Sequence, residues 1–199
     1  MKVAIILKAP KLNTAVEEDC VIYADGAYKF KEEVGEKEVI AVVGDFDSLG
    51  EAPKNEKVVT LNVEKNFTDG ERAVRLAVEN GASELVIYGA YGGKIEHVLG
   101  NIALLSIAND LGVKASIKEE NTITELFSGK KDFAVKKGGT ISLIPYGGDC
   151  VFESSLGLYY PLNALTLTPS DTRGISNVAI EEKISIEIKK GKALIIYGK

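Results

Sequence analysis

The stretch VVGDFDSL, Val42 to Leu49, decides how the first half of this chain folds. It completes a continuous β-branched apolar run that begins after Glu38, and such a run predicts a strand buried on both faces of a sheet. The run ends on a glycine followed by two carboxylates one residue apart, Asp45 and Asp47. Because neighbouring carboxylates repel each other, we expect a positively charged group between them.

Strand-like and helical patterns alternate on both sides of this stretch. Besides the run that ends at Asp45, the residue patterns predict strands at 3–7, 20–25, 57–66 and 84–90. Strands that alternate with helices over the first 118 residues predict an α/β fold with a doubly wound, mostly parallel sheet, a Rossmann-like arrangement.

Two helices are predicted within this part. The first begins at Thr68, where a capping box with Glu71 marks a helix start, and it ends at a stop signal formed by Asn80 and Gly81. The second is predicted over 95–111, with apolar residues at Ile95, Val98, Leu99, Ile102, Leu105 and Ala108.

The residue pattern of the sequence changes after about residue 119. From there it predicts short alternating strands separated by turns such as 137–139 and 190–192, with no helical pattern of useful length. This pattern predicts an all-β part, a small sandwich or barrel. We therefore expect two domains, an α/β nucleotide-binding domain at 1–118 and a β-sandwich at 119–199.

Composition excludes several classes of partner and location. The chain has 199 residues, 45% of them hydrophobic, and a net charge of −5, which argues against nucleic acid or an anionic membrane as the main partner. The apolar run at 3–7 is too short for a signal peptide, and no window approaches a membrane span. Cys20 and Cys150 are expected to be reduced thiols of a cytoplasmic protein. With one histidine, a zinc site is not expected.

Acids and glycines follow four successive predicted strands. In an open parallel sheet, ligands bind beyond the carboxyl ends of the strands, so these residues are the candidates for a site. They are Asp25 and Gly26; Asp45 and Asp47; Lys65, Asn66 and Asp69; and Gly92, Gly93, Lys94, Glu96 and His97.

Three of the acids suggest a metal site. Asp45, Asp47 and Asp69 could converge on Mg²⁺, which prefers oxygen ligands and is usually held by one or two carboxylates plus substrate phosphates. Taken singly, each acid has a simpler explanation, because an aspartate in the first turn of a helix is favoured by the helix dipole. Three acids at adjacent strand ends favour the metal.

The other candidates each have a structural alternative. The Gly92–Gly93 turn with Lys94 could cradle a phosphate, or it could be a tight turn. Arg72 could face the site or form an ion pair with Asp69. His97 could orient a substrate or serve structure only. The polar loop at 168–179 could contribute to a ligand pocket, or connect two strands.

Taken in order, these motifs resemble those of the bacterial type of thiamine pyrophosphokinase. The matching pieces span residues 24–177 and keep the family's order and approximate spacing. They are ADGAY (24–28), GDFDSL (44–49), EKNFTDGERAV (64–74), GAYGGKIEHVLGNIALL (89–105), SLIPYGG (142–148), GLYYPLNALTLT (157–168) and TRGISN (172–177). The chain departs from the family's usual pattern at several substrate-side positions, Ile175 among them.

The resemblance implies a fold, a reaction and an assembly. It implies an N-terminal nucleotide-binding domain, a C-terminal β-sandwich and a homodimer with thiamine bound where the two subunits meet. The implied reaction moves the pyrophosphoryl group of ATP to the thiamine hydroxyl with Mg²⁺ and releases AMP. Either Asp69 or Glu96 could accept the hydroxyl proton, and the sequence does not choose between them.

The resemblance also implies a role for each candidate residue. Catalytic roles fall to Asp45, Asp47, Asp69 and Glu96, and Mg²⁺ binding falls to Asp45, Asp47 and Asp69. ATP binding falls to Asp25, Gly26, Asn66, Thr68, Arg72, Gly92, Gly93 and Lys94. Thiamine binding falls to Lys65, His97, Thr172, Arg173, Ser176 and Asn177.

Two other functions stay open at this point. A phosphohydrolase could use the D-x-D motif as nucleophile and acid, although in such enzymes the motif follows the first strand and here it follows the third. A non-catalytic relative could bind thiamine or a nucleotide without converting it.

Overall fold

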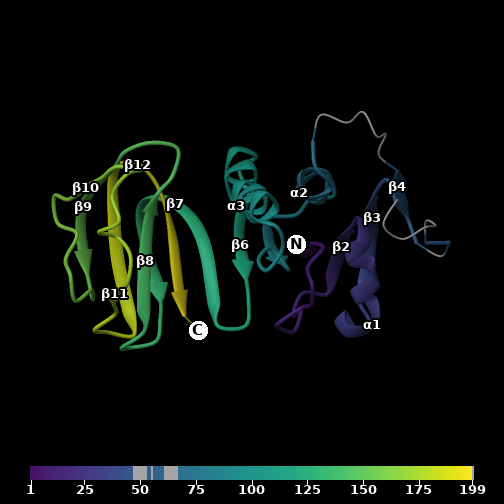
Figure 1. The fold of residues 1–199 in the computed structure, drawn as a ribbon, viewed down its shortest axis with the longest axis horizontal. Helices are drawn as coiled ribbons and strands as arrows, with labels where there is room; N and C mark the ends of the chain where they lie inside the picture. Colours follow the sequence, from purple (N-terminus) through teal and green to yellow (C-terminus); the bar gives the residue numbers. More distant parts are fainter. Residues whose placement is uncertain (47–52, 55, 61–66, 199) are drawn as a thin grey trace. The chain divides into compact units, whose positions relative to one another are not determined.

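The computed structural model describes residues 1–46, 53–54, 56–60 and 67–198 of the chain. The chain forms two compact units, Met1–Glu120 and Asn121–Lys199. Figure 1 labels most of the helices and strands of both units, and each unit has its own hydrophobic core.

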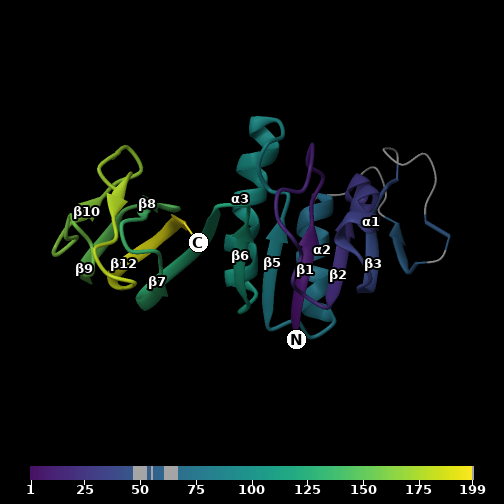
Figure 2. The same ribbon diagram turned by 90° about the horizontal axis from the view of Figure 1, so that it is seen from below.

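The strands described in the first unit all run parallel to their neighbours. Across the sheet they follow the order β6–β5–β1–β2–β3–β4, and Figure 2 shows the first five side by side. Because β1 pairs with β2 on one side and with β5 on the other, the sheet grows from β1 in both directions. The predicted doubly wound parallel sheet is therefore confirmed. The bounds are β1 Lys2–Ile6, β2 Cys20–Ala24, β3 Glu38–Gly44, β4 Val58–Thr60, β5 Glu84–Tyr88 and β6 Lys114–Lys118.

Both faces of the central strands are buried, as a continuous apolar run requires. In β1, Ile6 belongs to a core cluster with Phe30 and Val34, which come from the 3₁₀ helix η1 (Asp25–Phe30) and the short helix α1 (Lys31–Val34). Ile5, which points to the opposite face, is also fully buried. Helix α2 (Asp69–Glu79) packs against β1, β2 and β3, and α3 (Ile95–Asp110) packs against α2 and β6.

Helix α2 begins and ends where its sequence signals predict. The Thr68 hydroxyl oxygen accepts a hydrogen bond from the backbone N–H of Glu71 at 3.2 Å, so the predicted N-cap is confirmed. Asn80 is the C-cap, and Gly81 follows it with a φ of 83°, a conformation that favours glycine. The apolar face of the helix, Ala73, Val74, Leu76 and Ala77, is buried.

Helix α3 differs from its prediction in what it buries. Leu105 and Ala108 are buried, but Ile95 is 69% and Leu99 62% exposed. The apolar stripe is therefore covered by its own chain only toward the C-terminal end of the helix. None of the helices in the described part of the chain is long and apolar enough to cross a membrane.

The second unit is an antiparallel β structure organised by one long strand. β12 pairs with β7 along most of its length, with β9 through Ser185–Lys190, and with β8 through Ala193–Tyr197. β12 thus pairs with three other strands, and no helix occurs among residues 121–198. The predicted β-sandwich class is confirmed. The bounds are β7 Thr122–Ala134, β8 Thr140–Pro145, β9 Cys150–Leu156, β10 Thr166–Leu167, β11 Asn177–Val178 and β12 Lys183–Gly198.

The turn predicted at 190–192 is wrong, because these residues lie inside β12. Gly191 has a φ of 92°, and a Cβ atom on it would lie 2.3 Å from the carbonyl oxygen of Asp149. The pairing of β12 with β7 shifts register between Ile188 and Ala193. The glycine therefore permits an irregularity with close backbone approach within one strand, and it does not separate two strands.

The closest backbone approach in the second unit predicts the effect of a single methyl group. A Cβ atom on Gly174 would lie 2.0 Å from the carbonyl oxygen of Leu143, which is backbone and cannot rotate away. We expect Gly174→Ala to lower the free energy of unfolding by about 1–3 kcal/mol, the range that overpacking of this kind costs. Urea unfolding followed by far-UV circular dichroism measures the loss.

Gly100→Ala is the matched control, because nothing lies within 4 Å of a Cβ atom there and the residue is in α3. This control should gain roughly 0.5–1 kcal/mol from the higher helix propensity of alanine. Equal stability of Gly174→Ala and the wild-type protein would contradict the packing described here.

Candidate functional site

The carboxyl ends of β2 and β3 bring two of the predicted acids to adjacent positions. The strands pair in parallel with Ala24 opposite Val43. Asp25 directly follows β2, and Asp45 follows β3 after Gly44. Asp25 is buried and Asp45 is half-buried. Both acids therefore lie at the same edge of the sheet, where parallel α/β folds bind ligands.

Gly44 allows these two strand ends to pack without an intervening side chain. A Cβ atom at position 44 would lie 2.8 Å from the Cβ atom of Asp25 and 3.2 Å from its Oδ1 atom. The backbone is unusual on both sides, because Asp25 has a φ of 45° and Phe46 a φ of 61°. A non-glycine residue adopts such an angle only at a cost in free energy, so the surrounding structure must hold it there. Residues strained in this way are common at functional sites.

The start of α2 is held at the same edge by another glycine. A Cβ atom on Gly70 would lie 3.3 Å from Leu7, directly beyond β1, and 3.1 Å from Leu104 of α3. Asp69 is the first residue of the helix and is half-buried, and Thr68 caps it. The acid therefore lies where the N-terminal helix dipole favours a negative charge.

Arg72 does not pair with Asp69. Its Nη1 and Nη2 atoms donate to the two carboxylate oxygens of Glu79 at 2.7 and 3.0 Å, seven residues along the helix. The hydrogen bond from Arg72 lowers the pKa of Glu79. In this conformation the guanidinium extends along α2 and away from Asp69.

The glycine-rich segment Gly89–Lys94 connects β5 to α3. Gly89 has a φ of 70°, and a Cβ atom there would lie 2.7 Å from the carbonyl oxygen of Leu7. This contact places the start of the segment against the end of β1. Lys94 is the N-cap residue of α3, and the residues that surround it, Gly92, Gly93, Glu96 and His97, are exposed like Lys94 itself.

Two residues to which the sequence assigned no role in the site hold this segment. The Oε1 atom of Glu119 accepts hydrogen bonds from the backbone N–H groups of Ala90 at 3.1 Å and Tyr91 at 3.3 Å. The side-chain amide of Asn101 donates to the carbonyl oxygen of Ala90 at 2.9 Å. Glu119 directly follows β6, and that position beyond a strand end is the only sequence signal that could have identified it.

The polar loop of the second unit is ordered by an acid. The carboxylate of Asp171 accepts hydrogen bonds from the backbone N–H of Thr168 at 2.9 Å, from the Thr168 hydroxyl at 3.0 Å and from Nε of Arg173 at 3.0 Å. These bonds, the Thr168 backbone N–H first, lower the pKa of Asp171 to about 2. Arg173 and Thr172 are exposed beside it.

Ser176 and Asn177 occupy different positions in this loop. Ser176 is exposed with a φ of 61°, and its N–H donates to the Ser142 hydroxyl oxygen at 3.1 Å. Asn177 is buried, and its side chain both accepts from the N–H of Tyr160 at 3.0 Å and donates to its carbonyl oxygen at 2.7 Å. The amide of Asn177 thus fixes the backbone of Tyr160.

Tyr159 and Tyr160 are further residues that the sequence did not indicate. Their side chains are 63% and 61% exposed, and their rings meet edge to face with centroids 4.8 Å apart. Exposed aromatic pairs of this size are typical of binding surfaces. The backbone contact of Asn177 with Tyr160 links this pair to the polar loop.

The described residues contain no group of three or more His, Cys, Asp or Glu side chains arranged to hold a metal ion. Asp47, Lys65 and Asn66 lie outside the described residues. Carboxylates at the sheet edge, Asp45 and Asp69, supply the hard oxygen donors that Mg²⁺ prefers. A magnesium ion held by one or two carboxylates and by substrate phosphates remains compatible with this set.

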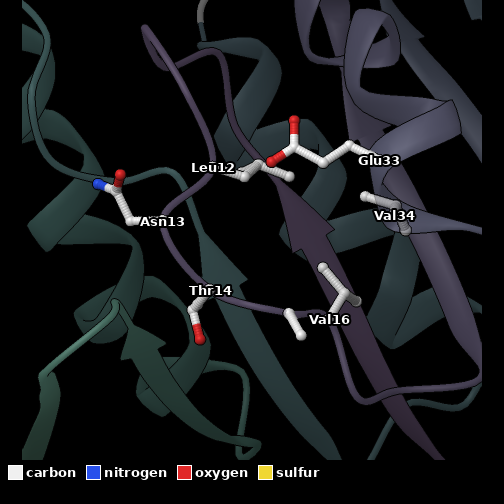
Figure 3. Close-up of a pocket in the computed structure, with 7 residues that line it drawn as sticks. Leu12, Asn13, Thr14, Val16, Glu33 and Val34 are labelled. Atoms are coloured by element: carbon white, nitrogen blue, oxygen red, sulfur yellow. The ribbon is translucent and has the colours of Figure 1, made fainter.

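A cavity of about 330 Å³ lies between the segment that follows β1 and helix α1 (Figure 3). Its polar side chains are those of Asn13, Thr14 and Glu33, and its apolar ones include Leu12 and Val34. None of the predicted site residues within the described ranges lines it. The cavity is therefore separate in its lining from the acids at the ends of β2 and β3.

Comparisons with known proteins give the same family for both units. A family model described as "Thiamin pyrophosphokinase, catalytic domain" matches residues 13–117, and one described as "Thiamin pyrophosphokinase, vitamin B1 binding domain" matches residues 128–193. A curated relative, the thiamine pyrophosphokinase of Bacillus subtilis (strain 168), is 32% identical over 169 residues, which are 79% of this chain and 77% of the relative.

Solved structures show the same fold over the whole chain. A crystal structure of thiamine pyrophosphokinase from Bacillus subtilis superposes with a TM-score of 0.88 at 26% identity, covering 100% of this chain and 99% of the other. A crystal structure of thiamin pyrophosphokinase from Geobacillus thermodenitrificans, 22% identical, has a TM-score of 0.82 and covers 100% and 98%.

The hydrogen bonds to Asp171 predict an acid dependence of stability. Because its pKa is about 2 in the folded chain and its ordinary value is 3.8, the ionised carboxylate stabilises the fold above about pH 4. This contribution is lost as the pH falls through 2. We expect Asp171→Asn to unfold at a lower temperature than the wild-type protein at pH 7, with a difference that shrinks between pH 4 and pH 2.

Thermal unfolding followed by circular dichroism at several pH values measures the difference. Asp149→Asn is the control, because Asp149 is an exposed acid of the same unit. An NMR titration that places the Asp171 carboxyl near 3.8 would contradict the prediction.

Proposed function

The chain belongs to the thiamine pyrophosphokinase family, and from this membership we propose that it transfers the pyrophosphoryl group of ATP to the hydroxyl of thiamine. The products are thiamine diphosphate and AMP. The observation that carries the proposal is the order of the two family matches. The catalytic-domain model covers most of the parallel-sheet unit, and the vitamin B1 binding model covers most of the antiparallel unit.

The proposed reaction forms one bond and breaks one. The thiamine hydroxyl oxygen attacks the β-phosphorus of ATP, and the bond from that phosphorus to the oxygen shared with the α-phosphorus breaks. AMP leaves with the bonding electron pair, and the hydroxyl proton passes to a carboxylate, Asp69 or Glu96. Such a transfer depends chiefly on positioning and on stabilising charge at the phosphates.

The edge at the ends of β2 and β3 supports the phosphate part of this reaction. Asp45 and Asp69, together with Asp47, would hold Mg²⁺, which when bound neutralises charge on the transferred phosphates. Asp25 and Gly26 border the nucleotide in this proposal. The support is the contact at Gly44, which brings the ends of β2 and β3 together.

The second unit supports binding of thiamine. Thr172, Arg173 and Ser176 are exposed in one loop, and Asn177 of the same loop fixes the backbone of Tyr160, whose exposed ring meets that of Tyr159. Aromatic faces attract cationic rings such as the thiazolium of thiamine. Asn177 acts in this proposal through the backbone of Tyr160.

We infer that the active form is a homodimer that binds thiamine where two subunits meet. The support is that each unit exposes large apolar side chains next to proposed site residues. In the first unit these are Ile95 and Leu99, on either side of His97, and in the second they include Tyr159, Tyr160 and Ile175. Exposed apolar groups of this kind mark interaction surfaces.

Incubation with ATP, Mg²⁺ and thiamine tests the reaction. We expect AMP and thiamine diphosphate to appear in equal amounts, and a chelator to stop both. Asp45→Asn should lower turnover by roughly 100-fold or more, because it removes charge at the phosphates, while the thermal unfolding temperature stays near that of the wild type.

Asp110→Asn is the matched control, since Asp110 is an exposed acid at the far end of α3. Inorganic phosphate and a trapped aspartyl phosphate in place of AMP would show a phosphohydrolase. Binding of thiamine without products would show a non-catalytic relative. Either result would overturn the proposed reaction.

Mixing two inactive variants tests the homodimer. Asp45→Asn changes the first unit and Arg173→Ala the second, and each should be inactive alone. When they are expressed together in equal amounts, half of the dimers carry one copy of each variant. If a site takes its two units from different subunits, one of the two sites in such a dimer is intact, so about one quarter of wild-type activity should return.

The oligomeric state, measured by light scattering, accompanies this experiment. Expression of each variant with itself is the control. Absence of recovered activity in proven mixed dimers would contradict a site shared between subunits.

A further inference from the structure

Ala90 is the one residue of the Gly89–Lys94 segment whose backbone groups are both shown bound to side chains from other elements, within the described part of the chain. Its N–H donates to Glu119, which follows β6, and its carbonyl oxygen accepts from Asn101 of α3. Glu119 also accepts from the N–H of Tyr91. Three elements, β5, β6 and α3, thus meet in hydrogen bonds to two consecutive peptide groups. We call Glu119 and Asn101 the Ala90 clamp.

The clamp lies beside the part of the sheet where open α/β folds bind their ligands. β1 is the strand at which the sheet grows in both directions, and β5 is its neighbour on one side. Ligands of open α/β sheets bind beyond such a switch point. Leu7 directly follows β1, and its N–H donates to the carbonyl oxygen of Tyr88 at 2.9 Å. The segment that carries Gly92, Gly93 and Lys94 therefore leaves the sheet at the switch point.

The segment is fixed at its entry and at its exit, and the clamp lies between. At the entry, the contact of Gly89 with the Leu7 carbonyl oxygen leaves no room for a side chain. At the exit, the carbonyl oxygen of Lys94 accepts from the N–H groups of His97 and Val98 at 3.0 and 3.1 Å, which starts α3. The clamp then leaves only 91–93 between Ala90 and the helix cap.

The chemistry of Glu119 is unusual for a structural support beside a phosphate-binding segment. Glu119 is only 9% exposed. Burial of a carboxylate costs free energy unless the carboxylate accepts hydrogen bonds. An anion at this place also occupies the N–H groups of Ala90 and Tyr91 as donors. A phosphate must then bind to the part of the segment that begins at Gly92, which fixes where the anion lies along the segment.

We propose that Glu119 and Asn101 are positioning residues for pyrophosphoryl transfer, which they serve by fixing the conformation of Gly89–Lys94 through Ala90. This inference rests on the proposed function. Neither side chain needs to touch ATP, because both act on the backbone that presents Gly92, Gly93 and Lys94. Misplacement of such a segment by an ångström lowers turnover strongly even when the substrate still binds.

The test uses Glu119→Gln and Asn101→Asp in the full chain. Gln keeps an acceptor oxygen but loses the charge, and Asp replaces the amide that donates to the Ala90 carbonyl oxygen with an acceptor. We expect each variant to lower kcat by at least 10-fold and to raise the KM for ATP, with the KM for thiamine changed less than 2-fold. Because both act on one residue, the double variant should lose little more than the worse single variant.

Two measurements separate positioning from stability and from the proposed function. Hydrogen exchange of the Ala90 and Tyr91 amides should be faster in Glu119→Gln, whatever the activity. The thermal unfolding temperature of each variant should stay within a few degrees of the wild type. Glu120→Gln and Asn109→Ala are matched controls, because these exposed residues lie next to β6 and near the end of α3, and they should keep wild-type kinetics.

Each remaining outcome contradicts the inference. An active wild-type enzyme with wild-type kcat and KM in both variants would overturn the positioning role alone. Loss of activity in proportion to a lower unfolding temperature, with independent effects in the double variant, would show a purely structural role. An inactive wild-type protein would overturn the proposed function and this inference with it, and only that outcome would affect the Asp45 experiment as well.

Discussion

The pairing of β1 with strands on both of its sides constrains the rest of the first unit. Because every described strand of this sheet runs in the same direction, each segment that leaves a carboxyl end emerges at one edge. Asp25, Asp45 and Gly89–Lys94 are separated in sequence, and for this reason all of them lie at that edge. Gly44, Gly70 and Gly89 have no side chain, and this absence lets the neighbouring segments pack closely at the edge.

The protein has a net charge of −5, and one of its proposed substrates, ATP, is an anion. Two of the basic residues assigned to the site, Arg72 and Arg173, have acidic partners in the structure, Glu79 and Asp171. Arg72, which the resemblance assigns to ATP binding, is therefore bound to a carboxylate of its own helix in this structure. In the proposed function, the other groups that would meet the phosphates are the N–H groups at the start of α3, Lys94 and a metal ion that the carboxylates would hold. An acidic protein can bind phosphates in this way because such means act only locally.

Local signals in the sequence predicted what local physics determines. The Thr68 cap, the stop at Asn80 and Gly81, and the alternation of strands with helices were sufficient for the sheet and for α2. The path of β12 through Gly191 was not predictable, because a glycine for close approach and a glycine for a turn look alike in sequence. The roles of Glu119 and Asn101 depend on which strand lies next to β5, a tertiary fact. The exposure of Ile95 and Leu99 was also not predictable, because a helical period indicates an apolar face but does not show what covers that face.

The shared strand β12 has a consequence for the order in which the second unit assembles. β7, β8 and β9 are translated before β12, and all three pair with it. Until the ribosome has released residues 183–198, these strands lack the common partner that completes their core, and their hydrogen-bonding edges are open to other chains. Nascent second units are thus exposed to aggregation for the whole interval between synthesis of β7 and of β12. In the first unit, β1, β2 and β3 can pair with one another as soon as they are made.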